Sequence, residues 1–180
     1  MKDIKMNLRQ FLIDVCIRRY DELEKTLDGL TAEQLDYQPG PESNSIGWLI
    51  WHATRSEDRM NADLFGEDQL WVSGKWHLKF NRPPDQNDTG YGHTPAQAID
   101  FKAPSIQVLL DYARAVHERT LLYISTRLTE KDLEREVVSP TLGTTNTVEQ
   151  RILSTINDFQ HIGQAGYVRG LLSGIGWYGR

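Results

Sequence analysis

Apolar residues recur at helical spacing in four long stretches of the chain. The first stretch covers about residues 7–28 and the third about residues 104–128. The stripe of the first is Leu8, Phe11, Leu12, Val15, Arg19 and Leu23, and that of the third is Ile106, Leu109, Leu110, Ala113, Val116, Thr120, Leu121 and Ile124. Spacings of three and four residues place side chains on one face of an α-helix. Each stretch is therefore predicted to be an amphipathic helix.

The other two stretches are marked by capping residues. Ser45 precedes an apolar run that ends before Gly66, which predicts a helix from residue 45 to 65. Thr147 and Gln150 form the sequence pattern of a capping box, and the helix that they begin is expected to end near Gly174. A hydroxyl before the first turn accepts a backbone N–H that no helical carbonyl can reach, which is why such residues start helices.

The same order of elements occurs twice. Leu30–Leu35 follows the first helix and Leu128–Leu133 follows the third. Both segments begin with Leu-Thr, have an amide or acidic residue three positions after the threonine, and end with leucine. A linker with proline comes next, with Pro39 and Pro41 in one case and Pro140 in the other, and a capped helix follows. The pattern Leu-Thr-x-x-x-Leu is common between helices, so by itself it is weak evidence. With its surroundings it predicts two helical hairpins, forming an all-α four-helix bundle and a single domain over residues 1–180.

Residues 66–103 form a connection too long for a simple turn. They include Trp71, Trp76 and the pair Pro83-Pro84. The aromatic residues indicate packing across one end of the bundle. There the connection would either roof a pocket or only cover apolar surface, and the sequence favours neither.

Charge and cysteine content narrow the class of protein. The net charge of −5 over 180 residues, with no basic run, argues against nucleic acid as the main partner. Cys16 is the single cysteine, so no internal disulfide forms, and its apolar surroundings predict a core thiol in a reducing compartment. The beginning of the chain lacks a signal-peptide pattern, and no run approaches the roughly 20 apolar residues of a membrane span. A cytoplasmic protein without membrane contact is expected.

Two histidines are the main candidates for chemistry. His52 lies in the second predicted helix and His161 in the fourth. A rotation of about 100° per residue places Asn157, His161 and Gln164 on one face of the fourth helix and turns Asp158 away from it. This helix also has an apolar second face. It is therefore expected to be buried on both sides, by the bundle and by loops or a second subunit.

Facing helices of a bundle could bring the two histidines together. Neutral imidazole binds zinc, nickel and iron, and bundle interiors commonly hold metals in this way. A catalytic zinc ion usually has three protein ligands, and the third donor here, Asn157, would be a weak amide oxygen. The alternative is that His52 and His161 are two core residues with satisfied hydrogen bonds.

The remaining histidines have weaker patterns. His77 and His93 fall in the long connection, where exposed and uninvolved histidines are usual. His117 lies beside the stripe of the third helix, where it would join the core or bind a carboxylate. No HExxH, P-loop or GxSxG pattern is present.

The two histidine segments together resemble a known family. The run from Ser45 to Arg59, which contains His52, and the run from Gln160 to Leu171, which contains His161, are similar to the second and fourth helices of DinB-like (YfiT-like) proteins. The resemblance implies an up-down-down-up four-helix bundle, often a homodimer, with zinc or nickel held by three histidines. His52 and His161 match the first and last ligands. Asn157 stands where the middle histidine is expected.

The resemblance also narrows the function. It implies a metal-dependent enzyme of the hydrolase type or the thiol-dependent transferase type, acting on a small-molecule substrate with a low-molecular-weight thiol. The alternative is a non-catalytic DinB-like bundle, a binding or stress-response protein, in which the metal site has degenerated at Asn157.

Overall fold

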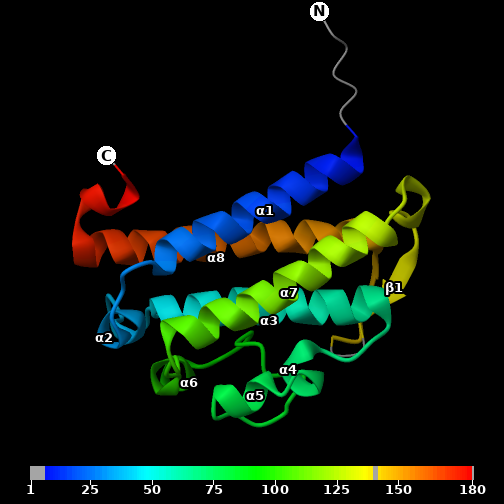
Figure 1. Cartoon of the computed structure of the whole chain (residues 1–180). Coiled ribbons are helices and arrows are strands. Elements are labelled where there is room, and N and C mark those ends of the chain that lie inside the picture. The colour runs from blue at the N-terminus through cyan, green and yellow to red at the C-terminus, as the bar shows by residue number, and fades with distance from the viewer. Residues whose placement is uncertain (1–6, 140–141, 180) are drawn as a thin grey trace, which may run out of the picture.

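Four long helices form the bundle in the part of the chain that the structure describes. The computed structural model describes residues 7–139 and 142–179, apart from the side chains of residues 155, 156 and 175. The long helices are α1 (Leu8–Leu27), α3 (Ile46–Phe65), α7 (Ile106–Thr126) and α8 (Val148–Ser173). Figure 1 shows α3 and α7 running in one direction and α1 and α8 in the other, so the expected up-down-down-up bundle is confirmed.

The helix ends follow from the capping residues. The Ser45 hydroxyl accepts the Trp48 backbone N–H at 3.2 Å, and Gly66 ends α3 in the left-handed conformation. Thr147 and Gln150 form the predicted capping box at the start of α8. These contacts are local in the chain, and all four predicted helices agree with the structure to within about two residues, the usual uncertainty of a helix end.

The repeated Leu-Thr segments also have the expected form. Thr31 caps the short helix α2 (Ala32–Asp36), and Thr129 caps the 3₁₀ helix η1 (Glu130–Asp132). The second linker differs from the first, because it holds a two-stranded antiparallel sheet that the sequence did not predict. Its strands are β1 (Glu136–Val138) and β2 (Thr145–Thr147), and each is too short to show an alternating pattern. Pro140 of this linker lies outside the described residues.

The connection between α3 and α7 lies along the flank of these two helices, rather than across one end of the bundle as predicted (Figure 1). It contains α4 (Leu70–Ser73), α5 (Trp76–Lys79) and α6 (Pro95–Asp100). Trp71 is fully buried, and its indole ring packs against the Tyr112 ring of α7. The Asp58 carboxylate of α3 accepts the Trp71 backbone N–H at 2.8 Å and the Tyr112 hydroxyl at 2.8 Å. A buried carboxylate thus holds the connection in place.

Val148 and Ile152, on one apolar face of α8, are buried, whereas the face that carries Leu153 and Leu171 is not covered by the described part of the chain. Leu153, Tyr167 and Leu171 are 48%, 70% and 52% exposed. The connection that could have covered them lies on α3 and α7 instead. A short 3₁₀ helix, η2 (Ile175–Tyr178), follows α8.

Cys16 is a buried core thiol, as predicted. It packs in an apolar cluster with Met60 and Ile152, and burial raises the pKa of its thiol to about 11. The thiol is therefore protonated and unreactive at neutral pH. Among the described residues, no helix is both long enough and apolar enough to cross a membrane.

Candidate functional site

His52 is held from two sides on α3. Its ring stacks on Trp48, one turn earlier in the helix, with ring centroids 4.8 Å apart. Its Nδ1 lies 2.5 Å from the backbone carbonyl oxygen of Thr89, in the connection. A carbonyl oxygen can only accept, so Nδ1 must carry the proton and donate. The Nε2 atom of His52 then keeps its lone pair.

His161 meets His52 from α8. The two rings contact edge to face, with centroids 4.7 Å apart and planes at 73°. The Nδ1 atom of His161 lies 3.0 Å from Oε1 of Gln164, an acceptor on the same helix. With this amide orientation, Nδ1 of His161 is also the protonated nitrogen, and its Nε2 also keeps a lone pair. The predicted meeting of these two histidines is found in the structure.

The charge state of His52 follows from its burial. Desolvation lowers the pKa of its imidazole to about 4, although the Thr89 carbonyl acts in the opposite direction. Electrostatic interactions with His161 and Arg59 lower the pKa of His52 further. His52 is therefore neutral at physiological pH, and neutral imidazole is the form that binds metals.

Two contacts fix the register of α3 against α8. His52 meets His161 at one point, and Asp63 pairs with Arg151 further along. Because the helices run in opposite directions, Asn157 lies between these points, near the level of Ser56. We name this strip between α3 and α8, from the histidine pair to the Asp63–Arg151 ion pair, the histidine seam.

Asn157, the third member of the predicted site, does not join the histidine pair. Its side chain is exposed, and within the described residues no hydrogen bond joins it to His52 or His161. Asp158, next in the chain, is predicted only to point away from the histidine face, and in the structure it is buried. In the described part of the chain, no three His, Cys, Asp or Glu side chains gather closely enough to hold a metal ion. The donor set that fits a metal is thus two imidazoles, with other positions left to weak donors, water or substrate.

A hollow lies beside the histidine pair. Its volume is about 540 Å³, within the range of small-molecule sites, and it lies between α8 and the start of α3. Leu49, one turn before His52, lines it, together with Gln160 and Gln164 on either side of His161. Gln164 therefore belongs both to the hollow and to the hydrogen bond that orients His161. Neither histidine lines the hollow itself, and Gln164 connects it to His161.

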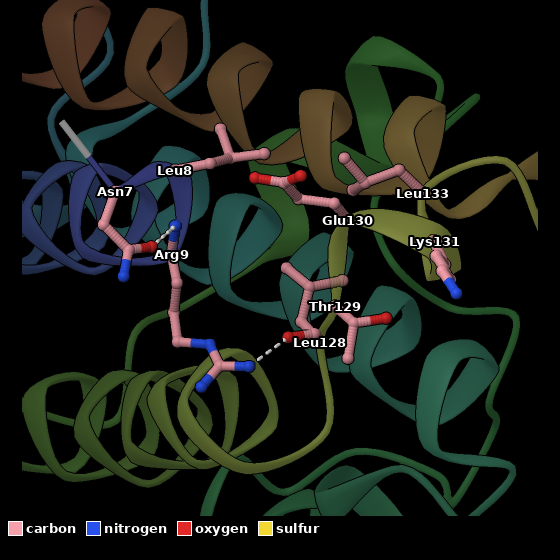
Figure 2. Close-up of a pocket in the computed structure, with 8 residues that line it drawn as sticks. All are labelled: Asn7, Leu8, Arg9, Leu128, Thr129, Glu130, Lys131 and Leu133. Atoms are coloured by element: carbon pink, nitrogen blue, oxygen red, sulfur yellow. Dashed lines mark hydrogen bonds between the residues drawn. The ribbon is translucent and has the colours of Figure 1, made fainter. Parts of the chain in front are cut away.

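A second hollow, shown in Figure 2, has no such chemistry. It lies where the start of α1 meets the segment Leu128–Leu133. Its polar groups serve the chain itself: Asn7 accepts the Arg9 backbone N–H, and the Arg9 guanidinium donates to the Leu128 carbonyl at 2.7 Å. None of its lining residues contacts His52 or His161 in the described part of the chain, whereas Gln164 of the first hollow is hydrogen-bonded to His161. The hollow at the histidine pair is therefore the better candidate.

Comparison with known proteins gives the family. Residues 17–165 match the family model described as the DinB superfamily. The chain belongs to the DinB superfamily. It is also similar to the crystal structure of a conserved protein from Enterococcus faecalis, with 31% sequence identity and a TM-score of 0.81 over 94% of this chain and 99% of that one. No curated protein matches it.

In this DinB-superfamily bundle, the connection supplies site residues that the sequence analysis missed. His93, expected to be exposed and uninvolved, accepts the Trp48 indole N–H at 3.2 Å and contacts the Asp88 carboxylate at 3.0 Å. Gly90 has a φ of +86°, and a Cβ there would lie 2.8 Å from Trp48 and 3.1 Å from the His52 ring. The short Gly90-Tyr-Gly92 run was the available signal, since such glycines mark a close approach of the backbone.

Arg55 attaches the same segment to α3. Its fully buried guanidinium donates to the backbone carbonyls of Asp85, Gln86 and Asp88 and lies over the Trp71 ring. The donors of a guanidinium have a fixed planar arrangement, so hydrogen bonds from Arg55 to three carbonyls hold this turn of the backbone in one conformation. The Thr89 carbonyl that orients His52 comes directly after this turn. His77 is likewise engaged, with Nδ1 2.9 Å from the Trp71 carbonyl oxygen.

Proposed function

We propose that this DinB-superfamily protein is a metal-dependent enzyme, a hydrolase or a thiol-dependent transferase, with its centre at the histidine pair. The observation that supports it most is that both imidazoles use Nδ1 for a hydrogen bond within the chain. Their Nε2 atoms are left without a partner among the described residues. Metal-binding histidines in proteins are held in this way, with the second nitrogen donating to a carbonyl or carboxylate.

His52 and His161 would hold a divalent ion, zinc or nickel, and Asn157 would supply at most a weak amide oxygen. When bound, such an ion lowers the pKa of a coordinated water or thiol, so that a nucleophile forms near neutral pH. The chain itself performs the other tasks. The Thr89 carbonyl and Gln164 keep the proton on Nδ1 of each ring, while Trp48 limits the rotation of His52.

The substrate would be a small molecule in the hollow lined by Leu49, Gln160 and Gln164. A low-molecular-weight thiol would be the co-substrate of a transferase. The amide side chains can donate to and accept from such a ligand, and the aliphatic wall excludes water from one side of it.

Metal content tests this proposal. Protein purified without a histidine tag is dialysed against zinc or nickel and analysed for bound metal, as wild type, His52→Ala and His161→Ala. We expect binding by the wild type and its loss in both variants. His77→Asn is the control, because His77 is bonded to the Trp71 carbonyl and has no contact with the pair. Wild-type protein that retains less than about one tenth of an equivalent of metal would contradict the proposal, since a site with micromolar affinity is nearly filled under these conditions.

Asn157 favours a second candidate, a non-catalytic bundle whose metal site has degenerated. Its side chain is exposed, and it has no described contact with the histidines. The hydrogen bond and the ring stacking of His52 would then serve only packing. Under this reading, His52→Ala lowers stability by about 1–3 kcal/mol through lost contacts, and metal changes nothing.

We also propose that the protein is a homodimer. The uncovered face of α8 continues into an apolar groove between α1 and α8, lined by Phe11, Leu12 and Leu153 among others. Large exposed apolar areas mark protein contacts, and a second copy presents the same surface. Light scattering at micromolar concentration should show a dimer, and Leu153→Glu should shift it to monomer. A monomeric wild type would contradict this assignment.

A further inference from the structure

Arg59 lies in the histidine seam, two helical turns after His52 on the same face of α3. The stripe His52, Ser56, Arg59 and Asp63 follows the spacing of one helix face, and its ends contact His161 and Arg151 of α8. Arg59 is half-buried between these ends. Its charge acts on His52 at one end of the stripe and on Arg151 and Asp63 at the other, so the guanidinium lies between the two ends.

Among the described residues, Arg59 forms no ion pair or hydrogen bond with an anion, although Asp63 and Asp158 attract it from a greater distance. Among the described residues it makes no hydrogen bond and no ion pair, and its buried Nε has no acceptor. Three other arginines also have an unpaired Nε, but each uses the rest of its guanidinium. Arg19 pairs with Glu57, Arg151 pairs with Asp63, and Arg169 donates to the carbonyls of Lys25 and Thr26. A cation that is partly removed from water without a partner is uncommon and needs a reason.

The carboxylates that attract Arg59 also interact with other cations. Asp63 is the nearest carboxylate on the same stripe, but it is paired with Arg151. Asp158 attracts Arg59 too, yet it interacts with Arg19 as well and forms no ion pair with Arg59 among the described residues. Arg151 itself adds repulsion to Arg59. The chain as a whole carries a net charge of −5, so a guanidinium without an ion pair at this place is a local feature and not a consequence of composition.

We propose that Arg59 binds an oxyanion, a carboxylate or a phosphate, that the small-molecule substrate carries into the histidine site. A guanidinium binds both groups with two parallel hydrogen bonds, which fixes the orientation of the ligand as well as its position. The reacting part of the substrate would then be held at His52 and His161, while its anionic end lies along the seam. We call Arg59 in this role the anion anchor. That its ligand is the substrate rests on the function proposed above.

Measuring anion binding by the metal-free protein tests directly whether Arg59 is an anion anchor. The probes are succinate and inorganic phosphate, titrated by calorimetry at an ionic strength kept constant with sodium chloride, because screening weakens such contacts. We expect saturable binding of at least one probe, and the tighter probe identifies the group as carboxylate or phosphate. Arg59→Gln should weaken it at least about tenfold, and Arg59→Lys should retain part of it, since an ammonium cannot bind in the bidentate manner.

Arg18→Gln is the matched control. Arg18 is exposed on α1, so the variant has the same change in net charge but leaves the seam intact. It should bind the probes like the wild type. The melting temperature gives a second readout: Arg59→Gln should melt higher than the wild type, because an unpaired cation beside Arg151 is removed.

Two results would overturn the proposal. One is a wild type that binds neither probe. The other is an Arg59→Gln variant that binds them within about twofold of the wild type, whether or not its melting temperature falls. The metal proposal is judged separately: Arg59-dependent anion binding in a protein that takes up no metal supports the anchor alone. Metal uptake without Arg59-dependent anion binding supports the metal centre alone.

Discussion

Polar side chains in the bundle interior are paired within the chain to a greater extent than those in the histidine seam. In the interior, each long helix contributes one member to a polar layer of Arg19, Glu57, Thr120 and Asp158. Glu57 accepts from the Arg19 guanidinium and from the Thr120 hydroxyl, which lies 2.5 Å away. In the seam, His52 and His161 each use one nitrogen and leave the other uncommitted, and Arg59 uses none. The charged groups of the interior layer are paired within the chain, although Nε of Arg19 has no acceptor. The histidine pair and Arg59 keep the groups for which we propose a ligand.

The carboxyl of Asp158 shows how closed the interior is. Burial, together with repulsion from Glu57, raises its pKa well above the usual range, although Arg19 and Arg59 act in the opposite direction. A buried carboxyl beside another carboxylate is more stable as a neutral acid. No such arrangement occurs on the seam side of α8, where Asn157 is exposed.

Breaking the interior pair should have the largest effect. Arg19→Met leaves the Glu57 carboxylate buried without its cation, which typically costs about 3–5 kcal/mol of unfolding free energy. The double variant Arg19→Met/Glu57→Leu should recover most of this loss, because no unpaired charge remains. Urea denaturation measures both. If the double variant were as unstable as Arg19→Met, the loss would come from packing, and the contrast between the two regions would fail.

Alanine substitutions at Gly90 and Gly92 distinguish the cost of backbone strain from the cost of a steric clash at the site. Both have positive φ, +86° and +77°, but an added Cβ meets Trp48 and His52 only at Gly90 and has open space at Gly92. Gly92→Ala should therefore lose about 1 kcal/mol, from strain alone, and Gly90→Ala about 2–3 kcal/mol. Gly90→Ala should also weaken metal binding, since it displaces the Thr89 carbonyl from His52. Equal stability losses in the two variants would show that the close approach at Gly90 does not matter.

Asn157→His tests whether the seam still has the geometry of a three-histidine site. A histidine one turn before His161 would add an imidazole on the same helix face. Zinc or nickel affinity should rise at least about tenfold, or roughly 1.4 kcal/mol, because imidazole is a far better donor than an amide oxygen. Competition with a chromophoric chelator measures the change. An unchanged affinity would mean that position 157 points away from the ion.

The titration of His117 should have the smallest effect on folding stability. Burial of the imidazole sets the direction of this pH dependence. Desolvation lowers the pKa of its imidazole, more than the nearby Glu57 carboxylate raises it. The unfolded chain then binds a proton near pH 6.5 that the folded chain binds only at lower pH, so folding stability falls as the pH drops below about 6.5. His117→Phe keeps the stacking on Tyr20 and removes the titration. Its stability should decrease less between pH 7 and pH 5 than that of the wild type, and an identical decrease would contradict the assignment.

Much of the site was predictable from helix periodicity. The positions of His52 and His161 on the second and fourth long helices made their meeting possible in a bundle, and the structure shows that they do meet. The same rotation predicted that Asp158 points away from the histidine face, but not that it is buried. The roles of His93 and Thr89 were not predictable, because they come from a connection of short helices and turns whose path has no periodic signal. Arg59 was part of a recognised segment, yet its lack of a partner becomes visible only when α8 is placed beside it.

The sequence by itself determined the four long helices, their ends and the faces that carry the histidines. Apolar spacing and caps such as Ser45 and Thr147 act between neighbours in the chain, so they can be read without a fold. Only the tertiary structure decided which nitrogen of His52 is available, because its partner Thr89 is 37 residues away in the sequence. The same holds for the register of α3 on α8, which leaves Arg59 unpaired between the histidine pair and Arg151. Such contacts depend on how whole helices and a long connection pack, and no local pattern encodes them.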